Sequence, residues 1–496
     1  MKNKDSLLKK IFFFLLVFLS LVSIMALLYI KRNFAFYNTN PIAQILFHVL
    51  VQIDGANPTF VKGIVIQIIV LPLIGAIIAT SSLFSNIKLL DKFQNTKFIL
   101  FIKKISIVLS LIVFIISFSL ICKKLEVVDY IKTYTVSSTL YEDEYVEPKT
   151  ANIIFPEQKR NLIYIFLESM ETSDYSIEQG GAFEECFIPE LYDLAENNIT
   201  FNNNKGFYIA PNTGWTVAAM IGQSSGIPLT IPVEANSFVT DNKFLPGAYS
   251  IGEILESEGY KNILTIGSEA GFGGRKDYYE KHGNYEIRDY NYALENGLVA
   301  TEDFVWWGYE DYKLYEFAKN DLLQLQESDQ PFNYTMLTVD THHNEGWVCK
   351  YCQNDFDEQL GNVYACSSRQ VYEFIEWCKK QDFYENTTIV ITGDHCSMDA
   401  HFDELLTDFD RRVYFTIINP PKGLNETNDR LICTFDLYPT TLASLGVEIE
   451  GNRLALGTNL FSNEQTLCEK YGKGKFFSEV FKNSTFYNEH ILYGIK

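Results

Sequence analysis

Residues 391–395 read ITGDH, and they close an apolar, β-branched run that begins at Thr387. Such a run predicts a buried strand, and Gly393 allows the chain to turn sharply at its end. In an open parallel sheet, functional groups gather just beyond the carboxyl ends of the strands. An acid beside an imidazole at such a place, here Asp394 and His395, can form half of a metal site. For an isolated Asp-His pair a solvated turn is the simpler interpretation, so the other strands of the chain decide.

Short apolar runs alternate with segments of helical length from Asn161 onward. The strand candidates are residues 161–166, 262–266, 334–339, 387–392 and 413–418. Segments such as 251–258 and 367–381 are long enough to be helices between them. This alternation predicts an α/β domain with a mostly parallel sheet flanked by helices.

Carboxylate and imidazole side chains follow three of these runs. Glu168 comes just after the first, the polar segment 340–343 (DTHH) ends the third, and Asp394 with His395 ends the fourth. Because the carboxyl ends of parallel strands meet at one edge of a sheet, these groups are expected to lie together. Oxygen and nitrogen ligands of this kind suit Mn²⁺, Mg²⁺ or Zn²⁺, so the pattern predicts a divalent-metal site.

The stretch APNTGWTVAAM, residues 210–220, adds a candidate nucleophile. Its first half is typical of a loop that enters a helix, and Thr213 would then be the helix N-cap. The start of a helix also favours a nearby phosphate, so the structural and catalytic roles of Thr213 do not exclude each other. A threonine hydroxyl is a poor nucleophile at neutral pH unless a base or a metal activates it.

The first 124 residues contain three apolar segments of membrane-spanning length. Residues 11–30, 64–84 and 105–122 are the candidates, after a short basic start. Between the second and third segments lie Lys88, Lys92, Lys97, Lys103 and Lys104. The positive-inside rule places these lysines and the N-terminus in the cytoplasm, and everything after Lys124 outside. The chain is therefore expected to be a multi-pass protein of the cell membrane with an extracytoplasmic catalytic domain.

One apolar segment is too short to span the membrane. Residues 41–51, PIAQILFHVLV, are expected to be interfacial or re-entrant. If they crossed, the topology would be inverted. The expected organisation is a membrane region at 1–124, a linker at 125–157, a catalytic domain at 158–462 and a C-terminal extension of that domain at 463–496.

Charge and cysteine content narrow the partners and the compartment. The formal net charge of -21 argues against nucleic acid, whose binding proteins carry basic stripes. Among nine cysteines, Cys122 ends an apolar span, Cys349 and Cys352 form a C-x-x-C, and Cys366 and Cys378 follow. In an exported domain disulfides are favoured. A structural zinc site remains the alternative, although no second C-x-x-C completes a four-sulfur set.

Residues 158–460 resemble the sulfatase-like domain, of the alkaline phosphatase superfamily, found in lipoteichoic acid synthases and related phosphoglycerol transferases. The resemblance is carried by FLES at 166–169, NTGWT at 212–216 with GIPL downstream, GFGGRKDYYEKHG at 271–283, TVDTHH at 338–343, ITGDH at 391–395 and FDLYPTTLASLG at 435–446. The GIPL block and the cysteine-bearing segments at 346–353 and 365–371 look most similar to the branch that adds phosphoglycerol to periplasmic glucans.

The resemblance implies a role for each matching residue. Glu168, Thr213, Asp394 and His395 would bind a divalent metal, with Mn²⁺ expected first and Zn²⁺ or Mg²⁺ as alternatives. Thr213 would also be the nucleophile that takes the phosphoryl group.

The same resemblance implies the substrates. Arg275 and His342 would hold the phosphoglycerol group. The donor would be phosphatidylglycerol in the membrane, and the acceptor an envelope glycan or glycolipid. Two features depart from lipoteichoic acid synthases: Gly273 stands where they carry a tryptophan, and three spans are expected instead of five.

Three other functions compete with phosphoglycerol transfer. A sulfatase needs a C/S-x-P-x-R motif, and NTGWT has neither its proline nor its arginine. A phosphoethanolamine transferase shares the metal, the threonine and the membrane anchor. An inactive membrane sensor of the same fold is the non-enzymatic alternative. The presence of Glu168, Thr213, Asp394 and His395 argues against it.

Overall fold

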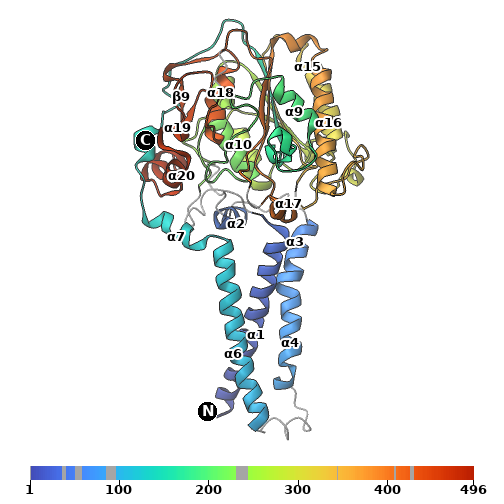
Figure 1. Ribbon diagram of the computed structural model, residues 1–496, viewed down its shortest axis with the longest axis vertical. Helices are drawn as coiled ribbons and strands as arrows, with labels where there is room; N and C mark the ends of the chain where they lie inside the picture. Colours follow the sequence, from blue (N-terminus) through green and yellow to red (C-terminus); the bar gives the residue numbers. More distant parts are fainter. Residues whose placement is uncertain are drawn as a thin grey trace. The chain divides into compact units, whose positions relative to one another are not determined.

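The computed structural model describes residues 2–35, 41–50, 58–84, 97–230, 244–342, 344–406, 409–424 and 429–495 (Figure 1). The chain forms two compact units. The first contains residues 1–34 and 56–129, and the second contains residues 35–55 and 130–496. The second unit therefore includes a short segment that lies, in the sequence, between the first two apolar spans.

The first unit is helical. Its elements are α1 (Lys2–Asn33), α3 (Pro58–Val65), η1 (Ile66–Val70), α4 (Leu71–Phe84) and α6 (Lys97–Lys124). Three helical stretches are long and apolar enough to cross a membrane, at Leu7–Asn33, Val61–Ser81 and Lys104–Lys124. These agree with the three predicted spans. Of the lysines used to orient them, Lys88 and Lys92 lie outside the described residues.

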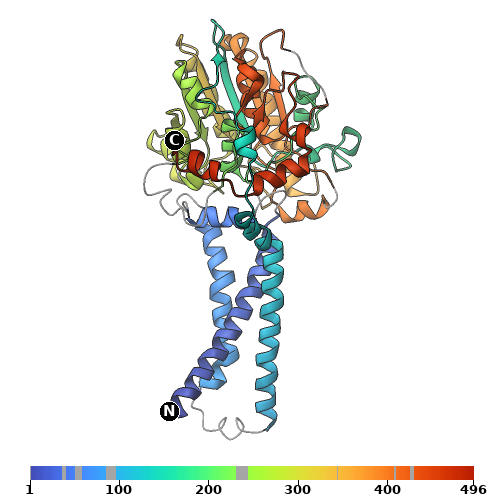
Figure 2. The ribbon, with the colours of Figure 1, turned by 90° about the vertical axis from the view of Figure 1, so that its left-hand side faces the viewer.

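Helix α1 packs against both α4 and α6 (Figures 1 and 2). Two polar contacts join α1 to α6: the Ser20 hydroxyl donates to the Ser110 carbonyl at 2.8 Å, and the Ser23 and Ser117 hydroxyls lie 2.6 Å apart. Small hydroxyl residues let spanning helices approach closely and hydrogen-bond to one another. The π-helical turn η1 ends two residues before Pro72 of α4, which has no N–H to donate.

The second unit is built on a six-stranded sheet with the order β4-β3-β5-β2-β6-β7. Its strands are β2 (Asn161–Leu167), β3 (Lys261–Ile266), β4 (Glu286–Arg288), β5 (Phe332–Leu337), β6 (Thr387–Gly393) and β7 (Phe415–Ile418). All neighbours are parallel except β6 and β7. The predicted mostly parallel α/β sheet is confirmed. Only the three-residue β4, too short to show a pattern, was not predicted.

Two hydrophobic cores cover the two faces of this sheet. Along β2, Leu162, Tyr164 and Phe166 face one core, and the residues between them face the other. The first core contains α10 (Thr216–Ser225), α12 (Ile251–Ser257), α13 (Arg275–Lys281), α18 (Leu437–Ala443), α19 (Leu467–Tyr471) and α20 (Lys473–Phe481). The second contains α9 (Pro189–Glu196), α14 (Tyr290–Glu295), α15 (Asp311–Leu325), α16 (Gln359–Cys378) and α17 (Ala400–Leu405), and several helices of each set are labelled in Figure 1.

The segment expected to be a linker is largely part of the second unit. It contains α7 (Val127–Thr135), α8 (Leu140–Glu144) and β1 (Ile153–Ile154), and β1 pairs antiparallel with β8 (Glu448–Ile449). Leu140 and Tyr141 are buried in the first core. Burial of these apolar side chains, together with the strand pairing, attaches the segment to the domain, so residues from 130 onward are not a free tether.

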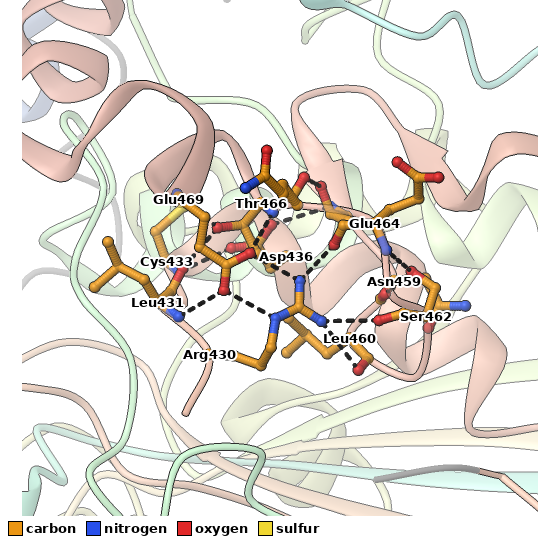
Figure 3. Close-up of polar contacts among 12 residues, drawn as sticks. Arg430, Leu431, Cys433, Asp436, Asn459, Leu460, Ser462, Glu464, Thr466 and Glu469 are labelled. Carbon is orange, nitrogen blue, oxygen red and sulfur yellow. Dashed lines mark hydrogen bonds and ion pairs between the residues drawn. The ribbon is translucent and has the colours of Figure 1, made fainter. Parts of the chain in front are cut away.

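The C-terminal extension is also joined to the domain, after β9 (Arg453–Leu454) and β10 (Gly457–Thr458). Figure 3 shows the Arg430 guanidinium bonded to Glu469 of α19 and to the carbonyl groups of Ser462 and Glu464. Glu469 accepts further bonds from the backbone N–H groups of Leu431 and Thr466. This network holds the extension against the chain that precedes α18.

The short apolar segment predicted to be interfacial forms helix α2 (Pro41–Leu50) of the second unit. The Phe47 side chain is buried in the first core, with its ring centroid 5.9 Å from that of Trp215. Gln44 donates to the Met398 sulfur at 3.5 Å, and the Ala35 N–H donates to the Met398 carbonyl at 2.8 Å. α2 therefore packs on two loops of the catalytic fold.

Candidate active site

In the ITGDH turn, the backbone at Met170 approaches Gly393 closely. A Cβ atom at this position would lie 2.0 Å from the Met170 carbonyl oxygen, so only glycine fits. Beyond it, the Asp394 Oδ1 atom accepts the N–H groups of Ser169 and His395, each at 2.8 Å. These bonds leave Asp394 Oδ2 buried and without a hydrogen-bond partner in the structure.

Glu168, Asp394 and His395 meet at the carboxyl ends of β2 and β6, where they form one buried cluster. The His395 Nε2 atom lies 3.5 Å from Glu168 Oε1 and 3.4 Å from Asp394 Oδ2. The His395 Nδ1 atom lies 2.8 Å from the Cys396 carbonyl, which can only accept a hydrogen bond. Nδ1 therefore carries the proton, and Nε2 can offer a lone pair to the cluster.

The electrostatics of this cluster favour a cation. Burial, reinforced by the negative charge of Glu168, raises the pKa of Asp394 to about 7. Burial disfavours the imidazolium form, but the carboxylates of Asp394 and Glu168 outweigh it and raise the pKa of His395. Two carboxylates and an imidazole, with one buried oxygen unpartnered, make a donor set that fits a divalent cation.

Two hydroxyl groups reach this cluster. The fully buried Ser169 hydroxyl donates to Glu168 Oε1 at 2.8 Å. The Thr216 Oγ1 atom lies 3.3 Å from Glu168 Oε2 and 3.4 Å from His395 Nε2. Thr216 is the first residue of α10, and its side chain is only half-buried. Because the positive end of the helix dipole favours an anion at this point, a phosphoryl group beside Thr216 would be stabilised.

Thr213, the nucleophile expected from the sequence, lies elsewhere. Its side chain is completely buried, and its hydroxyl is bonded to the Ala210 carbonyl at 2.7 Å and to the Thr434 hydroxyl at 2.9 Å. A Cβ on Gly222 of α10 would lie 2.9 Å from the Thr213 methyl group. Thr213 is therefore packed beneath the helix. It is not the N-cap either, since that position is Trp215.

Arg275 is buried at the first position of α13, after two glycines with positive φ. Its guanidinium donates to the Ser268 hydroxyl and the Glu269 carbonyl, while its Nε has no partner in the structure. Burial lowers the pKa of Arg275 to about 10, and the charges of Glu168, Asp289 and Asp394 oppose this shift. Arg275 is thus a cation at neutral pH within the field of the cluster.

His342 follows β5, as predicted, and lies beside an aromatic side chain that the sequence did not single out. Its ring centroid is 4.8 Å from that of Trp307, which in turn lies 5.5 Å from Phe272. The Arg275 guanidinium lies 5.7 Å from the centre of the Phe272 ring. A row of cationic, aromatic and imidazole groups thus connects Arg275 to His342.

Asp340, another of the predicted strand-end groups, is not part of the cluster. Its carboxylate accepts the Asp311 N–H at the start of α15.

A buried ion pair braces the loop after His395. Arg411 donates to both carboxylate oxygens of Glu171, at 2.8 and 2.6 Å, and to the Ser397 carbonyl at 2.7 Å. Glu171 also accepts the Ser397 N–H at 3.0 Å. A bidentate pair of this kind has a defined geometry, so it fixes the path of the chain next to the candidate ligands.

We expect Gly393→Ala to distort the candidate metal site and to destabilise the domain. The added methyl group must displace the Met170 carbonyl, and overpacking of this kind typically costs about 1–3 kcal/mol. Thermal unfolding and metal binding measure the two effects. Gly474→Ala is the matched control, since no atom lies within 4 Å of a Cβ there, and it should leave both unchanged. A Gly393→Ala protein with the unfolding temperature and metal affinity of the unaltered protein would contradict this account.

Comparison with known protein families identifies the fold. The sulfatase family profile matches residues 160–447, which is more than half of the chain. The chain belongs to the sulfatase family. The match covers the whole sheet, from β2 to β7, and both strand ends that carry the cluster. Membership of the family does not identify the reaction. The segment TVAAM, residues 216–220, has neither the proline nor the arginine of the C/S-x-P-x-R motif that a sulfatase needs.

Two similar proteins carry the name phosphoglycerol transferase I. The chain is 30% identical over 348 residues to phosphoglycerol transferase I of Escherichia coli strain 55989 and to that of Shigella boydii serotype 18. The match covers 68% of this chain and 42% of each relative, so the chain spans less than half of their length. The lipoteichoic acid synthase LtaP of Listeria monocytogenes has the same fold, with a TM-score of 0.50 at 19% identity over 66% of this chain and 82% of that one.

Proposed function

We propose that this protein is a membrane-anchored, metal-dependent phosphoglycerol transferase. It would move phosphoglycerol from phosphatidylglycerol, through a covalent intermediate on Thr216, to an envelope glycan or glycolipid. The observation that carries the proposal is the position of the Thr216 hydroxyl at the start of α10, beside Glu168 and His395. The similarity to phosphoglycerol transferase I supports the choice of the transferred group.

Glu168, Asp394 and His395 would hold the cation, for which Mn²⁺ is our first expectation and Zn²⁺ or Mg²⁺ the alternatives. When bound, a divalent cation supplies Lewis-acid stabilisation of charge on the hydroxyl and phosphoryl oxygens. Thr216 replaces Thr213 as the proposed nucleophile because it is accessible and lies at the cluster, whereas Thr213 is buried and hydrogen-bonded away from it.

The reaction would proceed in two displacements. In the first, Thr216 Oγ1 forms a bond to the phosphorus of phosphatidylglycerol, and the bond between that phosphorus and the diacylglycerol oxygen breaks. Thr216 loses its proton, and the diacylglycerol oxygen gains one. In the second, an acceptor hydroxyl bonds to the phosphorus and Thr216 regains its proton. Because donor and acceptor use the same site in turn, the kinetics should be ping-pong.

Arg275 and His342 would position the phosphoglycerol. The planar guanidinium of Arg275 suits two phosphoryl oxygens and already lies in the field of the cluster. His342 would hydrogen-bond the phosphoryl group or protonate the leaving oxygen, a role worth about 10²-fold or more. Trp307, whose ring is tilted against that of His342, would supply an apolar wall for the glycerol carbons.

Trapping the intermediate tests this function. Full-length protein is incubated with phosphatidylglycerol and Mn²⁺ without acceptor, digested, and analysed by tandem mass spectrometry. A glycerophosphate group on Thr216, distinguished from Thr213 by fragmentation, is the expected result. A phosphoethanolamine group formed only from phosphatidylethanolamine would instead identify the rival transferase. Turnover without any adduct would exclude the covalent mechanism.

We further propose that the catalytic unit lies outside the cytoplasm. Helix α2, which follows the first span in the sequence, belongs to the same compact unit as everything after residue 130. The connection between the first two spans would then lie on the same side of the membrane as the catalytic unit. Residues 85–96, between the second and third spans, then face the other side, together with the N-terminus.

A reporter fused after Lys124 is accordingly expected to be active only on the outer side of the membrane, because an odd number of spans precedes it. Alkaline phosphatase and green fluorescent protein fusions report the two sides. The same reporters inserted between residues 85 and 96 serve as the control and should give the opposite result. Cytoplasmic activity of the fusion after Lys124 would contradict the three-span topology.

A further inference from the structure

Three cysteines outside the candidate active site converge in space. Cys349 and Cys352 lie in the loop that follows His342, and Cys366 lies in the first half of α16. The Cys349 sulfur is 3.6 Å from that of Cys366 and 3.7 Å from that of Cys352. All three sulfurs lie within 4.8 Å of one another, and all nine cysteines of the chain are free. The disulfides favoured from the sequence are therefore not formed here.

The spacing of these sulfurs matches a tetrahedral thiolate site. With a Zn–S distance of about 2.3 Å and tetrahedral angles, two sulfurs on one zinc ion are about 3.8 Å apart. The separations of 3.6 and 3.7 Å in the structure are close to this value. A disulfide would instead bring one pair to about 2.0 Å and leave the third thiol unused.

Hydrogen bonds to the sulfurs favour thiolates. The Tyr351 N–H donates to the Cys349 sulfur at 3.4 Å, from within the C-x-x-C turn. The side-chain amide of Gln370, one turn after Cys366 on α16, donates to the Cys366 sulfur at 3.3 Å. Donors aimed at sulfur stabilise its negative charge, and a thiolate is the form that binds a metal.

We propose that Cys349, Cys352 and Cys366 bind one zinc ion. The ion would attach the loop after His342 to α16 and so restrain the backbone that carries His342. Cys378 cannot be the fourth ligand, because it lies about 18 Å further along α16 and is buried in the second core. Cys352 is only half-buried, so a water molecule can complete the tetrahedron.

Cobalt replacement tests this site separately from the active site. Full-length protein is stripped of metal and loaded with Co²⁺, and its absorption spectrum is recorded. A thiolate-to-cobalt charge-transfer band in the near ultraviolet is expected, and Glu168, Asp394 and His395 cannot produce one because they contain no sulfur. The band should be lost in Cys352→Ser and kept in Cys186→Ser, whose half-buried thiol is distant in sequence and outside the cluster.

The accessibility of the three thiols in the unaltered protein tests the zinc site even if Cys352→Ser does not fold. Thiol alkylation followed by mass spectrometry should label Cys349, Cys352 and Cys366 only after zinc is removed by a chelator. A crosslinked peptide pair containing Cys349 or Cys352 joined to Cys366 in unreduced protein would overturn the zinc site. Immediate alkylation that chelation does not change would overturn it as well.

Discussion

Thr216→Ala is expected to lower phosphoglycerol transfer by a factor of about 10³ or more, because it removes the proposed nucleophile. The protein should still fold. Thr216 contributes only one hydroxyl and one methyl group at a half-buried helix start, and its N–H remains in place. Release of diacylglycerol from labelled phosphatidylglycerol measures the first displacement directly, and circular dichroism verifies the fold.

Thr213→Ala is the matched control for this prediction. The two threonines are three residues apart, Thr213 in the loop before α10 and Thr216 at its first residue, and of the two only Thr216 reaches the cluster. Loss of the Thr213 hydrogen bonds should cost about 1 kcal/mol of stability and leave turnover within about tenfold. The opposite pattern, with an active Thr216→Ala and an inactive but folded Thr213→Ala, would restore the assignment made from the sequence.

Asp394→Asn is expected to weaken binding of the divalent cation by more than about 100-fold, since loss of an outer-shell partner alone costs about 10- to 100-fold. The substitution keeps the shape of the side chain, and its amide oxygen can still accept the N–H groups of Ser169 and His395. It removes the charge that faces His395 Nε2. Metal content after dialysis, and the Mn²⁺ concentration that restores transfer, measure the effect.

Asp340→Asn provides the control for Asp394→Asn. Asp340 is a buried acid at the same edge of the sheet, but its carboxylate serves the start of α15 and not the cluster. Metal affinity should therefore be unchanged in this variant. Full activity of the unaltered protein in excess chelator, or normal metal binding by Asp394→Asn, would contradict the metal site.

The strands and the cluster of Glu168, Asp394 and His395 could be predicted because both depend on short-range signals. Each long strand of the sheet is an apolar run bounded by polar residues, and parallel strands necessarily bring their carboxyl ends to one edge. The structure places the three ligand candidates together as expected.

The choice between Thr213 and Thr216 could not be made in this way. In NTGWT both threonines precede an apolar helical run, and each is a reasonable helix start by composition. The choice depends on where the helix begins, and helix boundaries are the least predictable feature of a sequence. A signal was present, since the helix-forming run TVAAM begins at Thr216. Trp307 beside His342 and the meeting of Cys366 with the C-x-x-C required the folded chain, because these residues are distant in sequence.

The position of α2 sets an order for the biosynthesis of the protein. This helix leaves the ribosome before any strand of the sheet, and the Trp215 and Met398 loops that it contacts are made much later. Until then its apolar side chains need another surface, which the lipid–water boundary provides for a short amphipathic helix. Docking of α2 would thus be a late step of maturation, and a fragment beginning at residue 158 would mature without it, leaving Trp215 next to the proposed nucleophile uncovered.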